Sequence, residues 1–361
     1  MKASASLRFG LPLWLALASA VAHAEPYLAV QQGYKCAACH FNPSGGGMRN
    51  DFGAIYSTTV LPARTSSSGP GWTGRIGDLL RIGGDWRASS RSSSEPHGAT
   101  DSHTGTDQLR VYAAASLFHD RAALYVDESL APGDARAMEA YARIGDPAHG
   151  WYLKAGQFYL PFGWRLQDQT SFVREVSGFS MTTPGKGAEL GYERGDWTAQ
   201  LDVVHGPPGN AGAFGNEWLL HAGQVHTTWR GGLSLASARS DAGDRHAVGT
   251  WAGLRSGPVA WLGELDLVSD SSYPEGTRRL LAGLAEADWA IRRGHNLKLS
   301  AELFDPDRSI AHDQQARWSL LYEYVPVAHL QLRAGVRRNR GIPQSDFQNR
   351  HLLFIELHAY L

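Results

Sequence analysis

The sequence predicts an all-β protein, an antiparallel transmembrane β-barrel of about sixteen strands with a small α-helical and coil segment at its N-terminus. Three observations lead to this fold. Segments of about ten residues with alternating apolar and polar side chains follow one another from Trp72 to Leu361. Short and long connectors alternate between these segments. After the first 24 residues, no apolar run is long enough to form a membrane-spanning helix.

The composition excludes several classes of protein. The 361 residues include 34 Lys and Arg against 35 Asp and Glu, so the chain has no basic surplus with which to bind nucleic acid. Hydrophobic residues make up 43% of the sequence, too many for a disordered protein. Because helical membrane proteins are also excluded, a soluble all-β protein and a membrane β-barrel remain.

Residues 1–24 form the first predicted element, a secretory signal peptide. Lys2 and Arg8 precede an apolar stretch, and Ala22-His23-Ala24 is a small-x-small cleavage site before Glu25. An uncleaved anchor is the alternative, which the short apolar run disfavours. Export would place the rest of the chain in an oxidising compartment, where two cysteines close together need an explanation.

Residues 25–64 contain both cysteines of the chain, in the pattern Cys36-x-x-Cys39-His40. This pattern is typical of covalent attachment of haem c, with two thioether bonds and the histidine as proximal ligand of the iron. A redox-active dithiol is one alternative, but the βαβ context that it normally has is absent. Zinc is another, and it needs two more ligands that the flanking sequence does not supply.

The segment of residues 25–64 is too small to bury a core of its own, and a covalently held haem would supply the missing apolar mass. We therefore expect a monohaem plug with a short helix over Met48–Val60, joined to the barrel by a linker of residues 65–71. The sixth ligand of the iron stays open. Met48 is one candidate, although packing on the haem edge explains it equally well, and Met138, Met181 and the histidines of the barrel region are the others.

The barrel is predicted over residues 72–361. In the plainest segment, Leu201 and Val203 share one face while Gln200 and Asp202 share the other. Sixteen segments begin near residues 74, 107, 121, 135, 149, 186, 196, 217, 231, 245, 258, 277, 295, 313, 328 and 347. An even number of strands returns both ends of the barrel to the same side of the membrane.

The connectors favour a membrane barrel over a soluble sandwich, because outer-membrane barrels have short periplasmic turns and longer outer loops. Connectors after even-numbered segments are short, as at residues 193–195, 230–232, 256–258 and 293–295. Those after odd-numbered segments include residues 92–106, 158–185, 206–216, 269–276, 305–312 and 341–347. The connectors after segments three and nine are short for outer loops.

The longest connector is the third outer loop, which contains the run Phe158-Tyr159-Leu160-Pro161-Phe162-Gly163. This run and the last 290 residues resemble phosphate-selective and related sixteen-stranded porins. The resemblance implies that the loop folds inward and constricts the channel; an ordinary outer loop is the alternative. Leu361 ends the chain where porins usually have an aromatic residue.

The order of leader, haem motif and porin-like barrel resembles the outer-membrane cytochrome–porin fusions, which include iron-oxidising c-type cytochromes. The resemblance rests on Cys36, Cys39, His40 and the barrel pattern. It implies a haem in the barrel that carries electrons between an extracellular donor or acceptor, such as ferrous iron, and a periplasmic carrier. The implied location is the outer membrane of a Gram-negative bacterium, in contact with outer-membrane lipid, and porins of this size are often homotrimers.

Two other functions stay open from the sequence. One is a diffusion porin whose haem plug is structural or acts as a gate. The other is a haem enzyme, but no acid–base or nucleophile pattern is visible, so an electron-transfer protein is favoured over an enzyme.

The plug is expected to enter the barrel from the periplasmic end, because it precedes the first strand by a short linker. The third outer loop would then cover the other side of the haem. Met181 or a histidine is the expected ligand from that side, with Arg165, Arg174 and Lys186 near the anionic propionates.

Overall fold

The computed structural model describes residues 25–65, 71–98, 100–118, 120–146, 148–206 and 215–361. The predicted signal peptide and most of the predicted linker lie outside the described residues. None of the described helices is long and apolar enough to cross a membrane.

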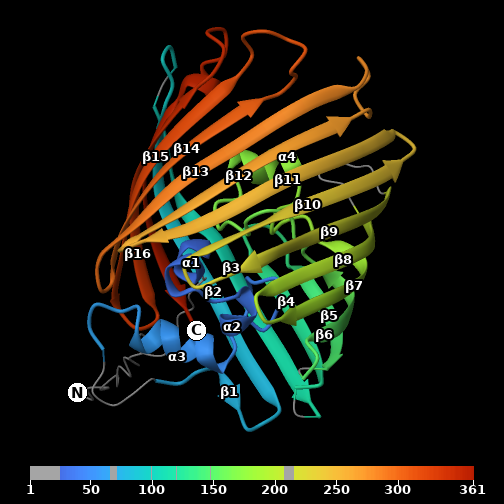
Figure 1. The fold of residues 1–361 in the computed structure, drawn as a ribbon. Helices are drawn as coiled ribbons and strands as arrows, with labels where there is room; N and C mark the ends of the chain where they lie inside the picture. Colours follow the sequence, from blue (N-terminus) through green and yellow to red (C-terminus); the bar gives the residue numbers. More distant parts are fainter. Residues whose placement is uncertain (1–24, 66–70, 99, 119, 147, 207–214) are drawn as a thin grey trace, which may run out of the picture.

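The described part of the chain forms a closed antiparallel barrel of sixteen strands, which confirms the predicted fold class (Figure 1). The barrel closes because the last strand pairs with β2, with Tyr360 opposite Asp85. A two-residue strand, β1 (Arg75–Ile76), adds to the edge of β2. The barrel strands are β2 (Leu80–Ser94), β3 (Asp101–Leu117), β4 (Ala122–Ala131), β5 (Arg136–Asp146), β6 (Trp151–Phe158), β7 (Gly185–Arg194), β8 (Trp197–Gly206), β9 (Gly215–Val225), β10 (Trp229–Ser240), β11 (Gly243–Ser256), β12 (Val259–Asp270), β13 (Arg278–Arg292), β14 (His295–Asp305), β15 (Gln315–Val327), β16 (Leu330–Arg340) and β17 (His351–Tyr360).

The alternating pattern places apolar side chains outside the barrel and charged side chains inside. On β12, Leu265 and Leu267 are exposed on the outer surface, whereas Glu264 and Asp266 are buried. This distribution is the inverse of a soluble protein and is the one expected where lipid surrounds the wall. The outer surface therefore has the character of a membrane-spanning barrel.

Exposed tryptophans mark the two rims of this apolar band. Such aromatic girdles lie at the membrane–water interfaces of outer-membrane barrels. Trp151, Trp197, Trp229, Trp261 and Trp289 lie near the short-turn ends of their strands. Trp218 and Trp318 lie near the long-loop ends.

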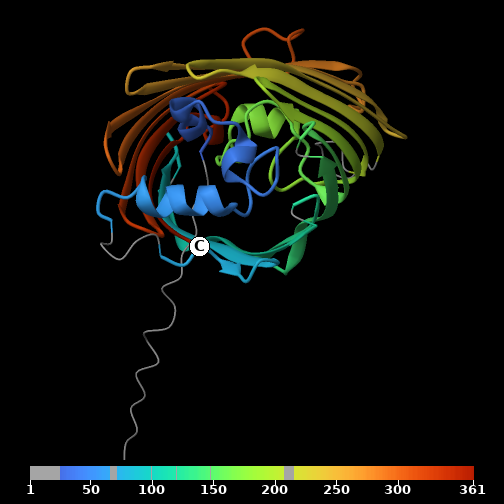
Figure 2. The ribbon, with the colours of Figure 1, turned by 60° about the horizontal axis from the view of Figure 1, so that its bottom comes forward.

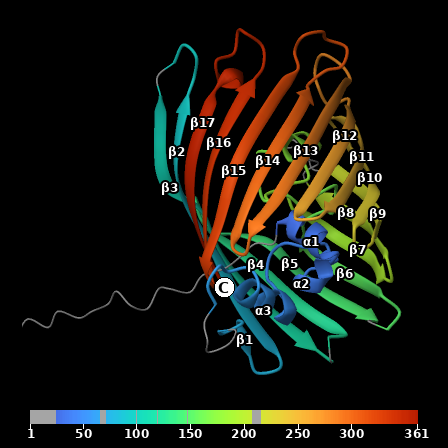
Figure 3. The ribbon, with the colours of Figure 1, turned by 60° about the vertical axis from the view of Figure 1, so that its left-hand side comes forward.

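The connectors have the predicted parity. The connectors at the mouth where β2 begins and β17 ends are short. The C-terminus lies at this mouth (Figure 3). Connectors at the opposite mouth are longer, except residues 132–135 and 241–242, which are also the two that the sequence shows as short. We call the mouth with the short connectors the short-turn mouth and the opposite one the long-loop mouth.

The N-terminal segment occupies the barrel from the short-turn mouth (Figure 2). Helix α1 (Pro26–Gln32) lies inside the barrel, where the Tyr27 hydroxyl donates to Glu323. Helix α3 (Asp51–Thr59) ends at the mouth, where Arg293 donates to the carbonyl oxygens of Thr59 and Val60. The predicted helix over Met48–Val60 is therefore present as α3.

The third outer loop, residues 159–184, folds into the lumen and carries α4 (Phe172–Ser177). The Trp164 amide donates to Glu264 on β12, and its indole donates to the carbonyl of Gly263. Apolar side chains of the loop and of α1 form one buried cluster with the wall of β9–β13. The loop and the N-terminal segment therefore pack against each other inside the barrel.

Candidate functional site

The cysteine motif forms a single helical turn, α2 (Cys36–Cys39), inside the barrel. Residues three positions apart on a helix share a face, so both thiols point to the same side. Both are free. His40 follows as the helix cap, with its amide donating to the carbonyl of Cys36 at 3.0 Å. The motif is therefore presented as one compact unit.

The chain then folds back on the motif. Gly45, Gly46 and Gly47 all have positive φ, which lets residues 41–48 return in a tight loop. The Phe41 amide donates to the carbonyl of Met48 at 3.0 Å. This return places Arg49 beside His40 in a short β-bridge.

A large cavity lies between the motif, the third outer loop and the barrel wall. Its empty space is about 1400 Å³, counting the part open to solvent. The lining includes Cys36, Cys39, His40, Arg49 and Tyr56 from the N-terminal segment, Leu160, Pro161, Trp164, Arg165 and Met181 from the loop, and His221, Arg230 and Trp251 from the wall. The Cys36 side chain is exposed into this cavity. Partial removal from water by the surrounding protein raises the pKa of its thiol.

His40 is buried, with 5% of its surface exposed. Its Nδ1 has no hydrogen-bond partner within the described residues. Burial, together with the positive charges of Arg49 and Arg165, lowers the pKa of His40 to about 3. The imidazole is therefore neutral at pH 7, which is the form that binds a metal ion.

Three arginines give the cavity a positive surplus. Arg49 is buried, and one of its terminal nitrogens has no hydrogen-bond partner in the described part of the chain. Burial lowers the pKa of Arg49 to about 10. Arg230 is buried too and donates to the carbonyl of Ala29, while Arg165 lies 3.5 Å from Glu139. Arg49 and Arg230 form no ion pair within the described residues, and buried cations of this kind favour an anionic group in the cavity.

The other predicted site residues are distributed unevenly. Met181 and Arg165 line the cavity. Met48 does not line it; this side chain is buried with Phe41 and Tyr125 in a separate cluster. Met138 on β5 is also buried away from the cavity. The cavity lining therefore gives no support to Met48 as the distal ligand of a haem.

Of the other two cations expected near the propionates, one is already paired and one lies outside the cavity. Arg174 reaches the cavity but is already paired with Glu264 on β12. Lys186, the second residue of β7, is exposed and is not part of the lining. Arg49 and Arg230, which were not predicted, line the cavity as well. Arg49 could have been found as a cation nine positions after His40, whereas Arg230 carries no signal in the sequence.

His221 on β9 is the histidine of the barrel wall that lines the cavity. Its Nδ1 lies 2.9 Å from the Ser234 hydroxyl, and its ring stacks on Trp251 at 5.1 Å with an interplanar angle of 8°. A hydrogen bond at one ring nitrogen fixes the orientation of the other. His221 therefore joins Met181 among the side chains that could approach a cofactor from the barrel.

The residues present fit a covalently bound haem. The two thiols, the neutral imidazole next to them and the surplus of positive charge match its vinyl groups, its iron and its propionates, respectively. Among the described residues, no group of three or more His, Cys, Asp or Glu side chains could hold a metal ion by itself.

Comparison with solved structures shows a porin fold. An anion-selective porin from Comamonas acidovorans aligns with a TM-score of 0.62 at 10% identity, over 78% of this chain and 99% of that chain. OprB of Pseudomonas putida aligns with a TM-score of 0.60 at 9% identity, over 85% and 100%. OmpT of Vibrio cholerae in a trimer form aligns with a TM-score of 0.58 at 12% identity, over 79% and 100%.

No protein-family model and no curated protein matches the sequence. The chain thus has the fold of an outer-membrane porin, and this fold, with its apolar outer band, places it in the outer membrane of a Gram-negative bacterium.

Proposed function

We propose that this porin-fold chain is an outer-membrane c-type cytochrome–porin, in which one haem c inside the barrel carries electrons between the cell exterior and the periplasm. One observation carries the proposal. The only two cysteines of the chain and the histidine next to them line a cavity within the lumen. A haem attached there would be shielded by protein on both sides.

Each residue of the site has a role that follows from its position. Cys36 and Cys39 would tether the haem, and His40 would bind its iron. Arg49, Arg165 and Arg230 would neutralise its propionates. When bound, the haem supplies one-electron oxidation and reduction. The apolar cluster formed by α1 and the third outer loop packs beside this site.

The packing of the lumen favours electron transfer over diffusion of solutes. The third outer loop and α1 share one buried apolar cluster, so a solute could pass between them only by separating them. Electrons need no such opening. Since one haem does not span a wall about 30 Å thick, an extracellular donor such as ferrous iron and a periplasmic carrier would approach from opposite mouths.

A diffusion porin with a structural or gating haem plug is the second candidate. The fold comparisons favour it, because the similar structures include a porin named as anion-selective. In this alternative, the N-terminal segment leaves the lumen and solutes then pass. A homotrimer, as in the trimer form of the Vibrio cholerae protein, is compatible with both candidates.

The first experiment tests the haem itself. The purified protein should retain a haem stain after denaturation and gain the mass of one haem, and Cys36→Ala should lose most of both. Ala38→Ser is the matched control, because it leaves both thiols and His40 in place. A Cys36–Cys39 disulfide without a Soret band in the native protein would refute the proposal.

The second experiment separates the two candidates. Intact cells are titrated with a reductant that cannot cross the outer membrane, and the haem spectrum is recorded. An electron-transfer protein is reduced under these conditions. A haem that stays oxidised until the cells are lysed would favour the gated porin.

A further inference from the structure

The N-terminal segment and the third outer loop meet at one buried carboxylate of the barrel wall. Glu139 on β5 is fully buried, and its Oε1 accepts from the side-chain amide of Asn42 at 2.9 Å and from the backbone amide of Tyr159 at 3.1 Å. Its Oε2 accepts from Arg165 at 3.5 Å. One wall residue therefore binds both the third outer loop and residues 41–48, which we call the return loop.

Two other wall residues fix the ends of the return loop. The Tyr125 hydroxyl on β4 accepts from the amide of Met48 at 3.1 Å, and Arg143 on β5 donates to the carbonyl of Phe41 at 3.2 Å. Within the described residues, neither Tyr125 nor Arg143 forms a hydrogen bond with the third outer loop. Glu139 differs from both because it joins the two loops to each other.

Arg165 is the cation that this arrangement places at the cavity. Its guanidinium donates to the Ser44 hydroxyl at 3.3 Å and lies 4.7 Å from the centre of the Tyr159 ring. A Cβ at Gly46 would lie 2.5 Å from its Nε, so the guanidinium packs directly on the backbone of the return loop. Arg165 lines the cavity and Glu139 does not. Glu139 can therefore act on a group in the cavity through Arg165, without touching that group.

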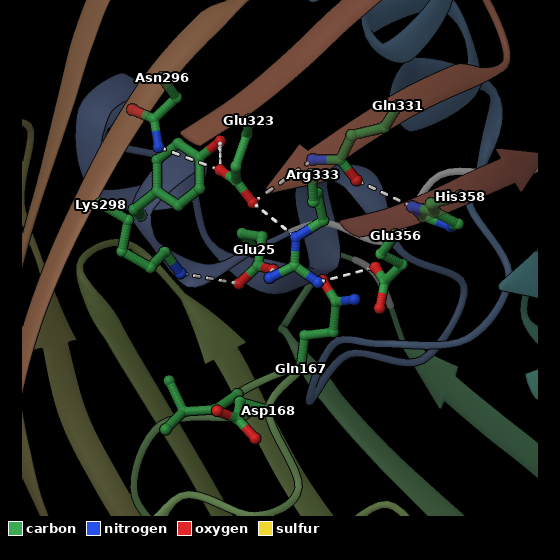
Figure 4. A network of polar contacts seen from close by, with 12 residues as sticks. Glu25, Gln167, Asp168, Asn296, Lys298, Glu323, Gln331, Arg333, Glu356 and His358 are labelled. Atoms are coloured by element: carbon green, nitrogen blue, oxygen red, sulfur yellow. Dashed lines mark hydrogen bonds and ion pairs between the residues drawn. The ribbon is translucent and has the colours of Figure 1, made fainter. Parts of the chain in front are cut away.

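The other polar junction of the N-terminal segment has no such link to the cavity. Glu25 lies 3.3 Å from Lys298 on β14 and 3.6 Å from Arg333 on β16, and Gln167 of the third outer loop lies beside it (Figure 4). Neither Lys298 nor Arg333 lines the cavity. This junction holds the segment in the barrel, whereas the junction at Glu139 also places a cation at the site.

We propose that Glu139 is a positioning residue, which joins the third outer loop to the return loop and holds Arg165 at the haem cavity. The inference rests on the proposed function, in which Arg165 neutralises a haem propionate. It goes beyond that function because a buried carboxylate that loses one of its donors is left partly unsatisfied, so the two loops move together. A movement of the outer loop is thereby transmitted to the cysteine motif.

Hydrogen exchange of the purified protein tests the junction itself. Glu139→Ala removes the acceptor that both loops share, so the amides of residues 41–48 and of Tyr159 should exchange at least about tenfold faster. Glu139→Gln should restore most of the protection, because the amide oxygen can still accept from Asn42 and Tyr159 while the NH₂ group faces Arg165. Faster exchange in only one of the two loops, or in neither, would overturn the proposal.

The reduction potential of the haem tests the role of Arg165. Arg165→Gln removes a positive charge from the cavity and should lower the potential. In the Glu139→Gln background, Arg165 is no longer held in place, so the shift caused by Arg165→Gln should fall to about half or less. Equal shifts in both backgrounds would show that the two residues act independently, against the proposal. Hydrogen exchange needs no haem, so a protein without haem would refute the proposed function while the exchange test still decides the junction.

Glu356→Gln is the matched control for both measurements. Glu356 on β17 is a buried carboxylate that pairs with Arg333 at 2.9 Å (Figure 4), and it forms no hydrogen bond with either loop in the described part of the chain. The substitution removes the same charge as Glu139→Gln. It should change neither the exchange of the two loops nor the shift caused by Arg165→Gln. If it reduces this shift as much as Glu139→Gln does, the loss of any buried charge of the wall has the same effect and Glu139 has no special role.

Discussion

At the scale of single residues, neighbouring positions are enough to group the cysteine motif, whereas its attachment to haem stays a prediction. Cys36, Cys39 and His40 are adjacent in sequence, and one helical turn brings them together whatever the rest of the fold does. Arg230 and His221 reach the same cavity from distant strands. Their roles depend on how the barrel closes around the N-terminal segment, which a local pattern does not encode.

Arg49→Gln should lower the reduction potential of the haem. The substitution removes a positive charge from the cavity, and positive charge favours the reduced state. We expect a change on the order of 1 kcal/mol, which for one electron is tens of millivolts. Arg293→Gln is the control, because Arg293 contacts the end of α3 outside the cavity. A redox titration that gives the same potential for both variants would contradict the proposed role of Arg49.

Met181→Leu and Met48→Leu test the distal ligand. Met181 lines the cavity and Met48 does not, so only the first substitution should alter the haem spectrum in the region of methionine ligation. Each replacement conserves most of the side-chain volume, which keeps packing effects small. If Met48→Leu alone changes the spectrum, the placement of Met48 in its apolar cluster does not describe the loaded protein. If neither does, His221→Ala is the next variant to measure.

At the scale of elements, the strands were predictable because lipid and lumen impose opposite polarities on alternate residues. The longest outer loop was predictable from its length. The first strand was placed too early, near residue 74, whereas β2 begins at Leu80; residues 75–76 form the short β1 instead. Helices α1 and α4 were missed because they are short and obtain their stability from packing against the wall, not from their own sequence.

Gly53→Ala should destabilise the N-terminal segment although Gly53 lies within helix α3. In an ordinary helix this substitution stabilises by about 0.5–1 kcal/mol. Here a Cβ at position 53 would overlap the carbonyl oxygen of Cys39, a backbone atom that cannot move aside cheaply. We expect a net cost of about 1–3 kcal/mol, measured as faster proteolysis of residues 25–64 and reduced haem loading.

Gly263→Ala on β12 is the matched control for this prediction. The nearest atom to its added Cβ is the carbonyl oxygen of Leu284 at 3.8 Å, which is an ordinary contact. A Gly53→Ala protein as resistant to protease as the Gly263→Ala protein would show that α3 does not pack closely on the haem motif.

At the scale of the whole molecule, closure of the barrel followed from an even number of strands and the parity of the connectors. The arrangement of the segments inside the barrel could not be predicted from these features. The sequence indicates that the N-terminal segment precedes the barrel, but the depth at which Glu25 lies depends on Lys298 and Arg333, more than 270 residues away. These ion pairs explain why a segment too small to fold alone has a fixed place in the lumen.

Conductance in planar bilayers tests whether the N-terminal segment and the third outer loop close the lumen together. The intact protein should conduct poorly. Deletion of residues 25–64 removes Tyr27 and Val30 from the apolar cluster and opens the short-turn mouth, but the loop still lies in the lumen, held by Arg174 and Glu264. Conductance should therefore rise several-fold on this deletion and further when residues 167–183 are also shortened.

A Cys36→Ala, Cys39→Ala variant is the control for this experiment, because it keeps the segment and removes the covalent tether of the haem. If this variant conducts as poorly as the intact protein, the packed segment closes the lumen and the haem does not. If deletion of residues 25–64 leaves the conductance unchanged, the segment does not occupy the lumen in the membrane. The haem would then belong to a tethered periplasmic cytochrome beside an ordinary porin, because nothing would hold α1 between the loop and the wall.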